Sequence, residues 1–397
     1  MPTAVIVDAV RTAAGRRNGQ LKDWHPVDLA AETLKALVAR NDIDPALIED
    51  VIMGCVMQVG EQGLNVGRNA ALAAGFPESV VGTTIDRQCG SSQQAAHFAA
   101  QAVMAGANDI VIAAGVEVMT RVPMGATVMS GPGLPFGNKI NERYAPVGGL
   151  VPQGISAELI ADKWGLTRED LDAFGAESQR RAEQATAEGR FENEIIGVTE
   201  KRIDKESGKL IESDELVLQD EGIRRDTTVE TLANLKPAFK PDGKITAGTS
   251  SQISDGASAA LIMSEEKANE LGLTPRARFH TFALAGVDPV TMLTGPIPAT
   301  EKALAKSGLS MDDIDLFEVN EAFASVVLAW EKEHHPDMAK VNPNGGAIAL
   351  GHPLGCSGAK LMATLLNELE RTGGRYGLQT MCEGGGMANA TIIERLG

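Results

Sequence analysis

The chain has 397 residues, with 53 acidic and 36 basic side chains and a formal net charge of −17. At roughly 100–200 residues per domain, this length predicts two or three structural units with cores large enough to need no disulfide or metal. The negative charge disfavours nucleic acid as the main partner because it repels phosphate, although a local basic site can still hold a small anion.

The four cysteines form neither a C-x-x-C pair nor a metal-type spacing with histidine, so we expect no disulfide framework and no metal site. This usage fits a reducing cytosol. The longest apolar runs, such as residues 110–116, are far below the ~18 residues that a membrane span needs. The N-terminus reads as a strand and lacks the layout of a signal peptide, so we predict a cytoplasmic protein.

Apolar periodicity predicts alternating strands and helices in the first part of the chain. In chain order we expect a strand at 5–10, a helix at 26–39, strand 51–55, helix 65–74, a short strand at 83–85, a helix with an apolar face from Ala95 to a stop near Gly106, and a strand at 109–116. A strand, a helix and a strand within about 30 residues favour parallel pairing.

Residues 121–250 have a different character. They begin with a segment rich in Gly, Pro and Met, continue with a long polar helix predicted at 169–189, and then alternate charge with short apolar stretches. We predict an inserted region that lies over the core. The strand and helix pattern resumes at 255–266.

The last 125 residues repeat the first pattern. Cys89 follows Val51 by 38 residues, and His352 follows Leu316 by 36. Each is followed by a glycine-containing turn, a helix and a strand, the second strand at 376–381. Two such halves would form a pseudo-twofold pair that brings Cys89 and His352 into one pocket. Any two strand–helix–strand units share part of this pattern, and that interpretation stays open.

Cys89 is a candidate nucleophile. A lone cysteine is usually a small buried hydrophobe, but Gly90 and the two serines after it permit a sharp turn before a helix. Amide N–H groups and the positive end of the helix dipole at this helix N-terminus favour the thiolate form of Cys89. We therefore expect the pKa of Cys89 to lie below the ~8.5 of a free thiol. Cys55 and Cys356 lack this setting, and we expect them to be packed.

His352 is a candidate base because a histidine between Gly351 and Pro353 is conformationally fixed. The alternative is a turn histidine satisfied by backbone groups. The remaining histidines have no comparable setting, and two of them, in a polar stretch, are expected to be solvated: His334 and His335.

Two further candidates lie near predicted strand ends. Cys382 directly follows a predicted strand, and three glycines starting at Gly384 expose N–H groups suited to an oxyanion hole, although a plain turn is the alternative. Asn320 closes another strand and could hold a water or a carbonyl. The zincin, P-loop, serine-elbow and dinucleotide-binding patterns are absent from the sequence.

These candidates stand in four sequence blocks, which are RQCGSSQQA around Cys89, VNEAFA around Asn320, NPNGGAIALGHPLGCSGAK around His352 and CEGGGMANA around Cys382. Together the blocks resemble the thiolase family, whose members make or cleave 3-ketoacyl-CoA thioesters, and the match runs from Val5 to Leu396.

The resemblance implies an α/β thiolase fold with two pseudo-twofold-related βαβαβαββ halves in five layers. The implied division is 1–120 plus 251–272 for the N-terminal half, 121–250 for an inserted loop domain, and 273–397 for the C-terminal half. It also implies a homodimer or homotetramer, no permanently bound cofactor, and acyl-CoA and CoA as substrates.

By this resemblance Cys89 is the acylated nucleophile, His352 deprotonates it, and Cys382 moves the proton on the α-carbon of acetyl-CoA. Asn320 would hold a water that completes one oxyanion hole, and the N–H groups of Cys89 and Gly384 would form the other. The implied pathway is ping-pong, with thiolysis of 3-ketoacyl-CoA to acetyl-CoA and a shortened acyl-CoA, or Claisen condensation of two acetyl-CoA in reverse.

Contacts to coenzyme A and the acyl group are implied at four further positions. Ser251 matches a pantetheine-contacting serine, Phe323 a pocket wall, and Arg224 a basic residue near the nucleotide, for which a solvated surface charge is the alternative. Gln153 stands where short-chain acetoacetyl-CoA enzymes often have Met, which argues against strict acetoacetyl specificity.

The sequence also departs from the family pattern. Many relatives have Asn at the position of Asp86, and Ser-Gly where this chain has Ser91-Ser92. The blocks around Cys89 and Cys382 look more like actinobacterial thiolases that degrade steroid-derived or other bulky acyl-CoAs. Two rival functions are a decarboxylating ketoacyl synthase, against which the second thiol argues, and a catalytically dead lipid- or CoA-binding relative, against which the four intact catalytic positions argue.

Overall fold

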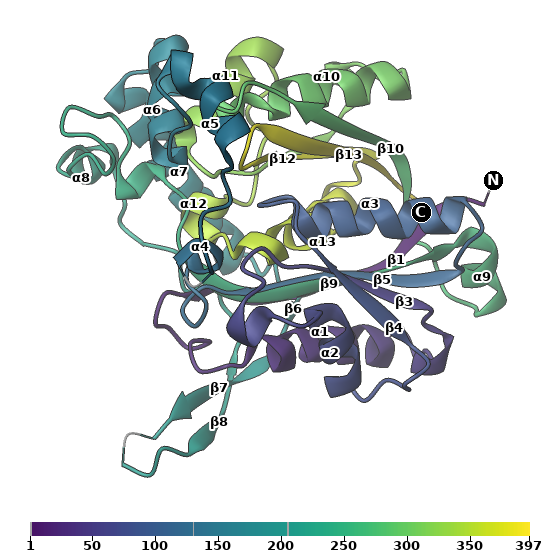
Figure 1. Ribbon diagram of the computed structural model, residues 1–397. Helices are drawn as coiled ribbons and strands as arrows, with labels where there is room; N and C mark the ends of the chain where they lie inside the picture. Colours follow the sequence, from purple (N-terminus) through teal and green to yellow (C-terminus); the bar gives the residue numbers. More distant parts are fainter. Residues whose placement is uncertain (1, 130, 205) are drawn as a thin grey trace.

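The structure, a computed structural model, describes residues 2–129, 131–204 and 206–397. Its main sheet follows the order β11-β12-β13-β10-β1-β9-β5-β3-β4, with β2 beside β9 and β6 beside β1 (Figure 1). The bounds of these strands are β1 Ala4–Thr12, β2 Gly15–Arg16, β3 Asp50–Gly54, β4 Val81–Ile85, β5 Ile110–Val118, β6 Ile195–Ile196, β9 Ser254–Ser264, β10 Ala277–Gly286, β11 Leu316–Val319, β12 Tyr376–Glu383 and β13 Met387–Arg395.

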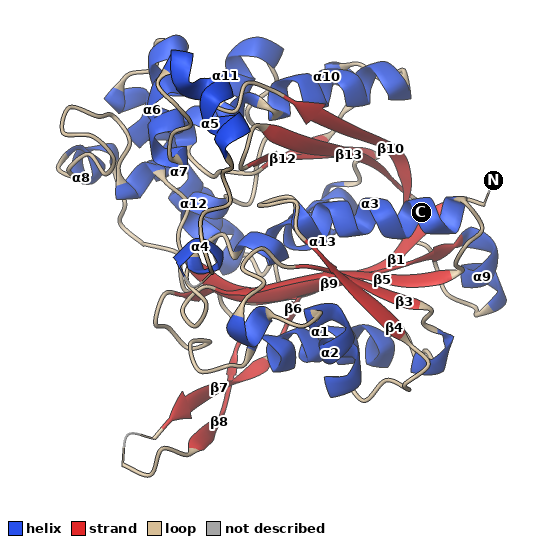
Figure 2. Cartoon of the chain, viewed as in Figure 1, coloured by secondary structure: helices blue, strands red, loops and turns tan. Residues whose placement is uncertain are grey.

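The N-terminal half contains the predicted parallel strands. Strand β3 pairs in parallel with β4 and with β5, whereas β9 runs antiparallel to β5 and to β1. Helices α1 (Pro26–Arg40) and α2 (Val66–Ala73) cover the outer face of this part of the sheet (Figure 2). Leu34 and Leu37 of α1 are fully buried there in one apolar cluster with Ile112 of β5. The alternating pattern of the sequence thus forms the expected α/β unit.

The C-terminal half repeats this arrangement. Strands β11 and β12 are parallel, and β13 is antiparallel to β12 and β10. Helices α10 (Pro296–Ser307) and α11 (Ala324–His334) bury Ala303 and Trp330 against Ile392 of β13. The repeat predicted from the sequence is therefore a repeat of structure.

Helices α3 (Ser91–Met104) and α13 (Ser357–Thr372) lie between the two parts of the sheet (Figure 1). Their apolar cluster joins Ala99 of α3 and Leu366 of α13 to Ile262 of β9 and Ile393 of β13. The order helix, sheet, helix, sheet, helix confirms the predicted five layers. The two central helices touch at their first turns, because a Cβ on Gly358 would lie 2.1 Å from the backbone nitrogen of Gln93.

Two predicted boundaries were wrong. The helix expected to show its apolar face from Ala95 begins at Ser91, since polar residues of its first turn are buried beside the other central helix. Cys382 lies inside β12 rather than after it, because pairing with β13 continues through Glu383, and the glycines then turn the chain. As a result, helix α3 begins two residues after Cys89, and strand β12 ends one residue after Cys382.

Residues between β5 and β9 contain short helices, one long helix and a hairpin. The elements are α4 Ala126–Met129, α5 Asn138–Tyr144, α6 Gln153–Lys163, α7 Arg168–Ala187, β7 Val198–Ile203, β8 Leu210–Val217 and α8 Val229–Ala233. Helices α6 and α7 pack against α11, and α7 also packs against the short α12 (Ala347–Leu350). The β7–β8 hairpin projects away from the layers (Figure 1).

The short helix α9 (Glu265–Glu270) follows β9. Among the described residues, no helix is long and apolar enough to cross a bilayer.

Candidate active site

The turn that carries Cys89 is fixed by local hydrogen bonds. Gln88 adopts φ +50°, an uncommon left-handed conformation for a residue other than glycine, and its N–H donates to the Asp86 carboxylate at 2.7 Å. The Ser91 hydroxyl donates to the Gln88 carbonyl at 2.6 Å and accepts from the Arg87 N–H at 2.9 Å. These contacts hold Cys89 one residue before the N-cap of α3, with only 4% of its surface exposed.

The residues that flank Cys89 lie against those that flank Cys382. A Cβ on Gly90 would lie only 2.2 Å from Oε1 of Glu383, the residue after Cys382. The Asn389 side chain of β13 donates through Nδ2 to the Gly90 carbonyl at 3.0 Å. The two cysteines come from opposite halves of the chain, and this contact places them in one site.

The glycine turn after Cys382 closes over the same place. A Cβ on Gly384 would lie 3.0 Å from Oε1 of Gln88 and 3.4 Å from Nε2 of Gln153. Gln153 begins α6, so the segment between β5 and β9 contributes to the site beside the second thiol. The structure therefore brings Gly384 and Gln153 together with the Cys89 turn.

The His352 loop is held by its backbone. Gly351 adopts φ +85°, a conformation that favours glycine, and the N–H of His352 donates to Gln252 O at 3.1 Å and Ser254 Oγ at 3.2 Å. Leu354, two residues further, belongs to the same apolar cluster as Cys89. The histidine loop and the Cys89 turn therefore adjoin.

The imidazole of His352 is oriented on both sides. Its Nδ1 lies 2.5 Å from Oγ of Ser357, and its Nε2 lies 3.4 Å from Nδ2 of Asn320. The N–H of Asn320 donates to the Thr380 carbonyl of β12 at 3.0 Å, which fixes the asparagine beside the strand that carries Cys382. His352 and Asn320, both predicted from the sequence, thus lie within reach of each other.

The two thiols and the imidazole of the site are uncharged in the free enzyme. Burial, with the Glu383 charge as the next contribution, raises the pKa of Cys89 to about 12, so the predicted lowering is wrong for the free enzyme. Removal of the thiol from water outweighs the helix N-terminus. Burial, then Cys89 and Glu383, raises the pKa of Cys382 well above its usual value. Burial and Lys360 lower the pKa of His352 to about 3, which keeps its imidazole neutral near pH 7 in the free enzyme.

An aromatic wall lies beside the second thiol. Phe323 is buried in the same apolar cluster as Cys382, and its ring centroid lies 5.8 Å from that of Phe239 in an edge-on arrangement. The Phe239 ring occupies the space that a Cβ on Gly154 would need. Ser251 lies close by, because its N–H donates to the carbonyl of Ala322 at 2.9 Å. This wall is suited to an apolar group.

A groove of about 630 Å³ runs past Ser251. It is lined by two of the residues predicted to contact coenzyme A, Ser251 and Arg224, together with Arg16 and Arg17. Arg224 is exposed, whereas its backbone N–H is held by the Gln179 side chain at 2.7 Å. Three arginines against one carboxylate, Glu221, which lies 3.7 Å from Arg16, leave the groove with a positive balance on an acidic protein, which is suited to a phosphate-bearing ligand.

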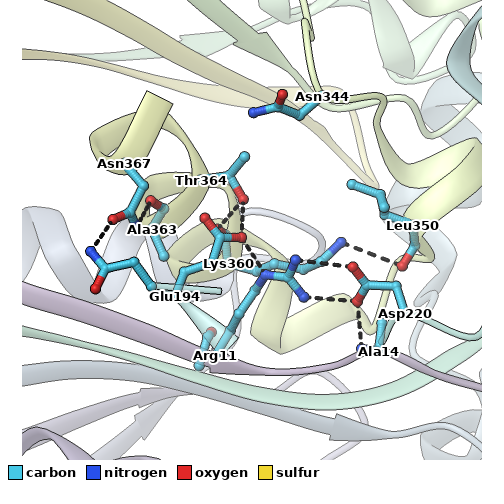
Figure 3. Close-up of polar contacts among 12 residues, drawn as sticks. Arg11, Ala14, Glu194, Asp220, Asn344, Leu350, Lys360, Ala363, Thr364 and Asn367 are labelled. Carbon is cyan, nitrogen blue, oxygen red and sulfur yellow. Dashed lines mark hydrogen bonds and ion pairs between the residues drawn. The ribbon is translucent and has the colours of Figure 1, made fainter. Parts of the chain in front are cut away.

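Lys360 donates a hydrogen bond to the backbone of the His352 loop. It is 3% exposed, and its ammonium donates to the carbonyl of Gly351 at 3.2 Å (Figure 3 shows its surroundings). Beside it Arg11 pairs with Asp220 at 2.7 Å and Glu194 at 2.6 Å, all fully or almost fully buried. Since Glu194 and Asp220 lie in the segment between β5 and β9, this cluster joins that segment to β1.

Several residues of the site were missed by the sequence analysis: Arg16, Arg17, Phe239, Ser357, Lys360 and Glu383. Ser357 and Lys360 lie inside the His352 block, and Glu383 is a charged residue directly after a candidate thiol. The sequence position of each of these three residues therefore indicated a place in the site. Elsewhere, Cys55 and Cys356 are buried, as expected. His335 is exposed as expected, but His334 is half-buried and bonds the Ile297 carbonyl, so its prediction was wrong.

Comparison with known proteins shows two matching family models and several similar proteins. The family model "Thiolase, N-terminal domain" matches residues 4–266, and "Thiolase, C-terminal domain" matches residues 273–395. The chain is 52% identical over 400 residues to steroid 3-ketoacyl-CoA thiolase FadA6 of Mycobacterium tuberculosis, covering all of this chain and 95% of that protein. It is 48% identical over 402 residues to a 3-ketoacyl-CoA thiolase of Idiomarina loihiensis, with full coverage of both.

Among solved structures, the crystal structure of the Bacillus anthracis acetyl-CoA acetyltransferase is similar with a TM-score of 0.89 and 41% identity, covering 100% of this chain and 99% of that one. The chain therefore belongs to the thiolase family. Enzymes of this family take CoA thioesters as substrates and need no permanently bound cofactor.

Proposed function

We propose that this chain is a degradative thiolase that works by a ping-pong pathway through a thioester on Cys89. The observation that carries the proposal is the contact between the Gly90 turn and Glu383, which places a thiol from each half of the chain in one buried site. The Sγ of Cys89 attacks the 3-keto carbon, the bond between the α-carbon and that carbon breaks, and the acyl group stays on the enzyme.

His352 acts as the base for Cys89. Its neutral imidazole accepts the thiol proton at Nε2 when the substrate arrives, because Nδ1 is engaged with Ser357. A thiol whose pKa is about 12 in the empty site would otherwise hold its proton. In the second half-reaction the Cys382 thiolate takes the thiol proton of coenzyme A as that sulfur attacks the acyl group, and the imidazolium returns its proton to the departing Sγ of Cys89.

Cys382 gives a proton to the α-carbon of the leaving acetyl-CoA enolate and takes it back in the reverse condensation. Negative charge develops on the 3-keto oxygen when Cys89 attacks and on the thioester oxygen of the acetyl-CoA enolate, and both oxygens need hydrogen-bond donors. A water held by Asn320 together with His352 serves one oxygen, and the N–H groups of Cys89 and Gly384 serve the other. The 3.4 Å approach of Asn320 to His352 and the approach of Gly384 to Gln88 support this assignment.

Coenzyme A lies in the groove with its pantetheine arm past Ser251 and its phosphates near Arg224. Ser251 lines this groove and donates its N–H to the carbonyl of Ala322, the residue before Phe323, so one end of the groove lies near the apolar wall. Arg16 and Arg17 supply further positive charge for the phosphates.

The acyl group is larger than acetoacetyl. Gln153 reaches the Gly384 turn in place of the methionine of short-chain enzymes, and Phe323 and Phe239 form an apolar wall beside it. One relative is named as a steroid thiolase, which favours a bulky substrate, whereas others are named simply 3-ketoacyl-CoA thiolase. Turnover of a panel of 3-ketoacyl-CoA substrates of increasing bulk tests this point.

We place the enzyme in the cytoplasm, in lipid degradation, as a homodimer or homotetramer. The exposed edge strand β4, where Val81 is 55% exposed, supports assembly. Light scattering on the purified chain gives the mass of the assembly, and a monomer would contradict this part of the proposal.

The decisive experiment is acylation with radiolabelled acetyl-CoA. Label should appear on the wild-type protein and be absent from Cys89→Ala, whereas a dead CoA-binding relative would take no covalent label. Cys382→Ser should still accept the label but lose condensation and most cleavage. Condensation that survives in Cys382→Ser, or turnover that depends on malonyl-CoA, would contradict the proposal, and the latter would favour a decarboxylating synthase.

A further inference from the structure

The carboxyl group of Glu383 is buried beside the reactive cysteine without a hydrogen bond. None of its surface is exposed, and neither carboxyl oxygen has a partner among the described residues. One oxygen lies against Gly90, as the 2.2 Å approach of a Cβ built there shows. A buried carboxylate without donors is costly, so this position favours the neutral acid.

The elements around this carboxyl offer little to stabilise a negative charge. The turn before α3 contributes Cys89, the Arg87 cation and the Asp86 anion, of which Arg87 favours and Asp86 opposes ionisation of Glu383. Strand β12 contributes the Cys382 thiol.

Two more polar groups face the same turn. Asn389 of β13 donates its Nδ2 to the Gly90 carbonyl, and its Oδ1 has no partner among the described residues. On β5, the charge of the Glu117 carboxyl raises the pKa of Cys89. This carboxyl accepts hydrogen bonds from the N–H groups of Val56 and Met57. The site thus gathers two thiols and three carboxyls, those of Asp86, Glu117 and Glu383, at one turn.

We propose that Glu383 is a positioning residue that must hold its proton for Cys89 to ionise, so that the two thiols and this carboxyl carry one negative charge among them. The neutral side chain fills the space beside Gly90 and keeps the Cys89 turn against the Cys382 strand. If Glu383 were ionised, its negative charge would repel the Cys89 thiolate and disfavour its formation. The inference rests on the proposed role of Cys89 as nucleophile.

The electrostatics agree with this arrangement. Burial raises the pKa of Glu383 to about 8, with Arg87 lowering it and Asp86 raising it by smaller amounts. The charge of Glu383 in turn raises the pKa of both thiols. Groups coupled in this way titrate as a unit, so the thiols become harder to ionise in the pH range where Glu383 loses its proton.

Glu383→Gln tests the proposal because the amide keeps the shape and cannot ionise. The rate of Cys89 alkylation by iodoacetamide, followed by mass spectrometry of its peptide from pH 6 to pH 10 in roughly unit steps, is compared with the wild type. Below pH 7, where the wild-type carboxyl is neutral, the two rates should agree. Above about pH 9 the variant should react at least about threefold faster, because the opposing charge is gone.

A matched control is Asp50→Asn. Asp50 also has a raised pKa and one carboxyl oxygen without a partner in the described part of the chain, but it lies at the far end of β3 from Gly54, which touches the start of α3. Its alkylation profile should follow the wild type. A ratio of variant to wild-type rates that does not change with pH, or a uniform loss of reactivity in Glu383→Gln, would overturn the proposal.

Alkylation does not require turnover, so its result is separate from the proposed function. If Cys89 takes no acetyl label but the pH-dependent ratio is seen, the role of Cys89 is wrong and the effect of Glu383 stands. If Cys89 takes the acetyl label but the ratio of alkylation rates does not change with pH, the role of Cys89 stands and the proposal for Glu383 is wrong. Should Glu383→Gln fold poorly, Glu383→Met, uncharged and of similar length, gives the same comparison.

Discussion

The Nδ1 atom of His352 lies 2.5 Å from Oγ of Ser357. The Ser357 hydroxyl itself donates to the Pro353 carbonyl at 2.8 Å, so its oxygen accepts a hydrogen bond from Nδ1–H. This fixes the tautomer of the neutral imidazole and leaves Nε2, on the side of Asn320, free to take a proton. One small hydroxyl therefore decides which nitrogen is the base.

Ser357→Ala should slow acylation of Cys89 about tenfold, because one net hydrogen bond is worth about 1–1.5 kcal/mol and each 1.4 kcal/mol is tenfold in rate. Without the serine the imidazole rotates and samples the other tautomer. Single-turnover labelling by acetyl-CoA measures the effect, and Ser357→Thr, which keeps the hydroxyl, should restore most of it. A wild-type rate in Ser357→Ala would show that the serine does not set the tautomer.

Arg224→Gln should raise the KM for coenzyme A several-fold with a smaller change in kcat, because the contact is with the phosphates and remote from the reacting atoms. The wild-type KM should rise with salt, and the variant should be less sensitive to it. Thiolysis rates at varied coenzyme A and at low and high salt give both values.

Arg180→Gln serves as the control for this substitution. Arg180 is an exposed arginine of α7 paired with Glu177 and does not line the groove. Its KM for coenzyme A should equal that of the wild type. An unchanged KM in Arg224→Gln would mean that Arg224 is only a solvated surface charge.

Asp220→Asn should destabilise the fold by about 3–5 kcal/mol, since it leaves the buried Arg11 charge without one of its two carboxylates. Asp220 accepts two hydrogen bonds from Arg11 and one from the Ala14 N–H (Figure 3). Urea denaturation at neutral pH measures the loss. A loss below about 1 kcal/mol, as expected for an exposed pair, would show that the cluster does not stabilise the fold.

The same pair gives a pH dependence. Burial alone would raise the pKa of Asp220, but the charges of Arg11 and Lys360 outweigh it and hold that pKa below its usual value. The stabilisation is therefore complete above the pKa of about 3.9 in the unfolded chain and is lost as the pH falls through the lower folded value. The unfolding free energy of Asp220→Asn should fall less steeply than that of the wild type as acid is added below pH 4.

Gly358→Ala should abolish folding or activity, whereas Gly384→Ala should be tolerated. The added Cβ at Gly358 would meet the backbone nitrogen of Gln93 at 2.1 Å, and both central helices are packed between the two parts of the main sheet, so neither has room to shift. At Gly384 the nearest atom is the end of the Gln88 side chain at 3.0 Å, which can shift, and the backbone N–H is kept. Soluble yield, melting temperature and thiolysis rate compare the two, and equal effects would contradict this prediction.

Local patterns predicted much of the fold. The strands of both halves, the repeat and the five layers follow from apolar periodicity and from turns at matching offsets, which depend on nearby residues only. The start of α3 was misplaced because its first residues are polar, and their burial depends on a helix more than 250 residues away in the chain, through contacts such as Ala359 N–H to the Ser92 hydroxyl.

The sequence by itself determined the reactive groups, since two thiols, an imidazole and an asparagine stand in glycine-rich blocks that set their backbone turns. Only the tertiary structure decided their protonation. A thiolate at a helix N-terminus was the local expectation, but the loss of water around Cys89 and the approach of Glu383 from the other half raise its pKa instead. Solvation and through-space charge depend on which distant segments pack together, and no sequence spacing encodes them directly.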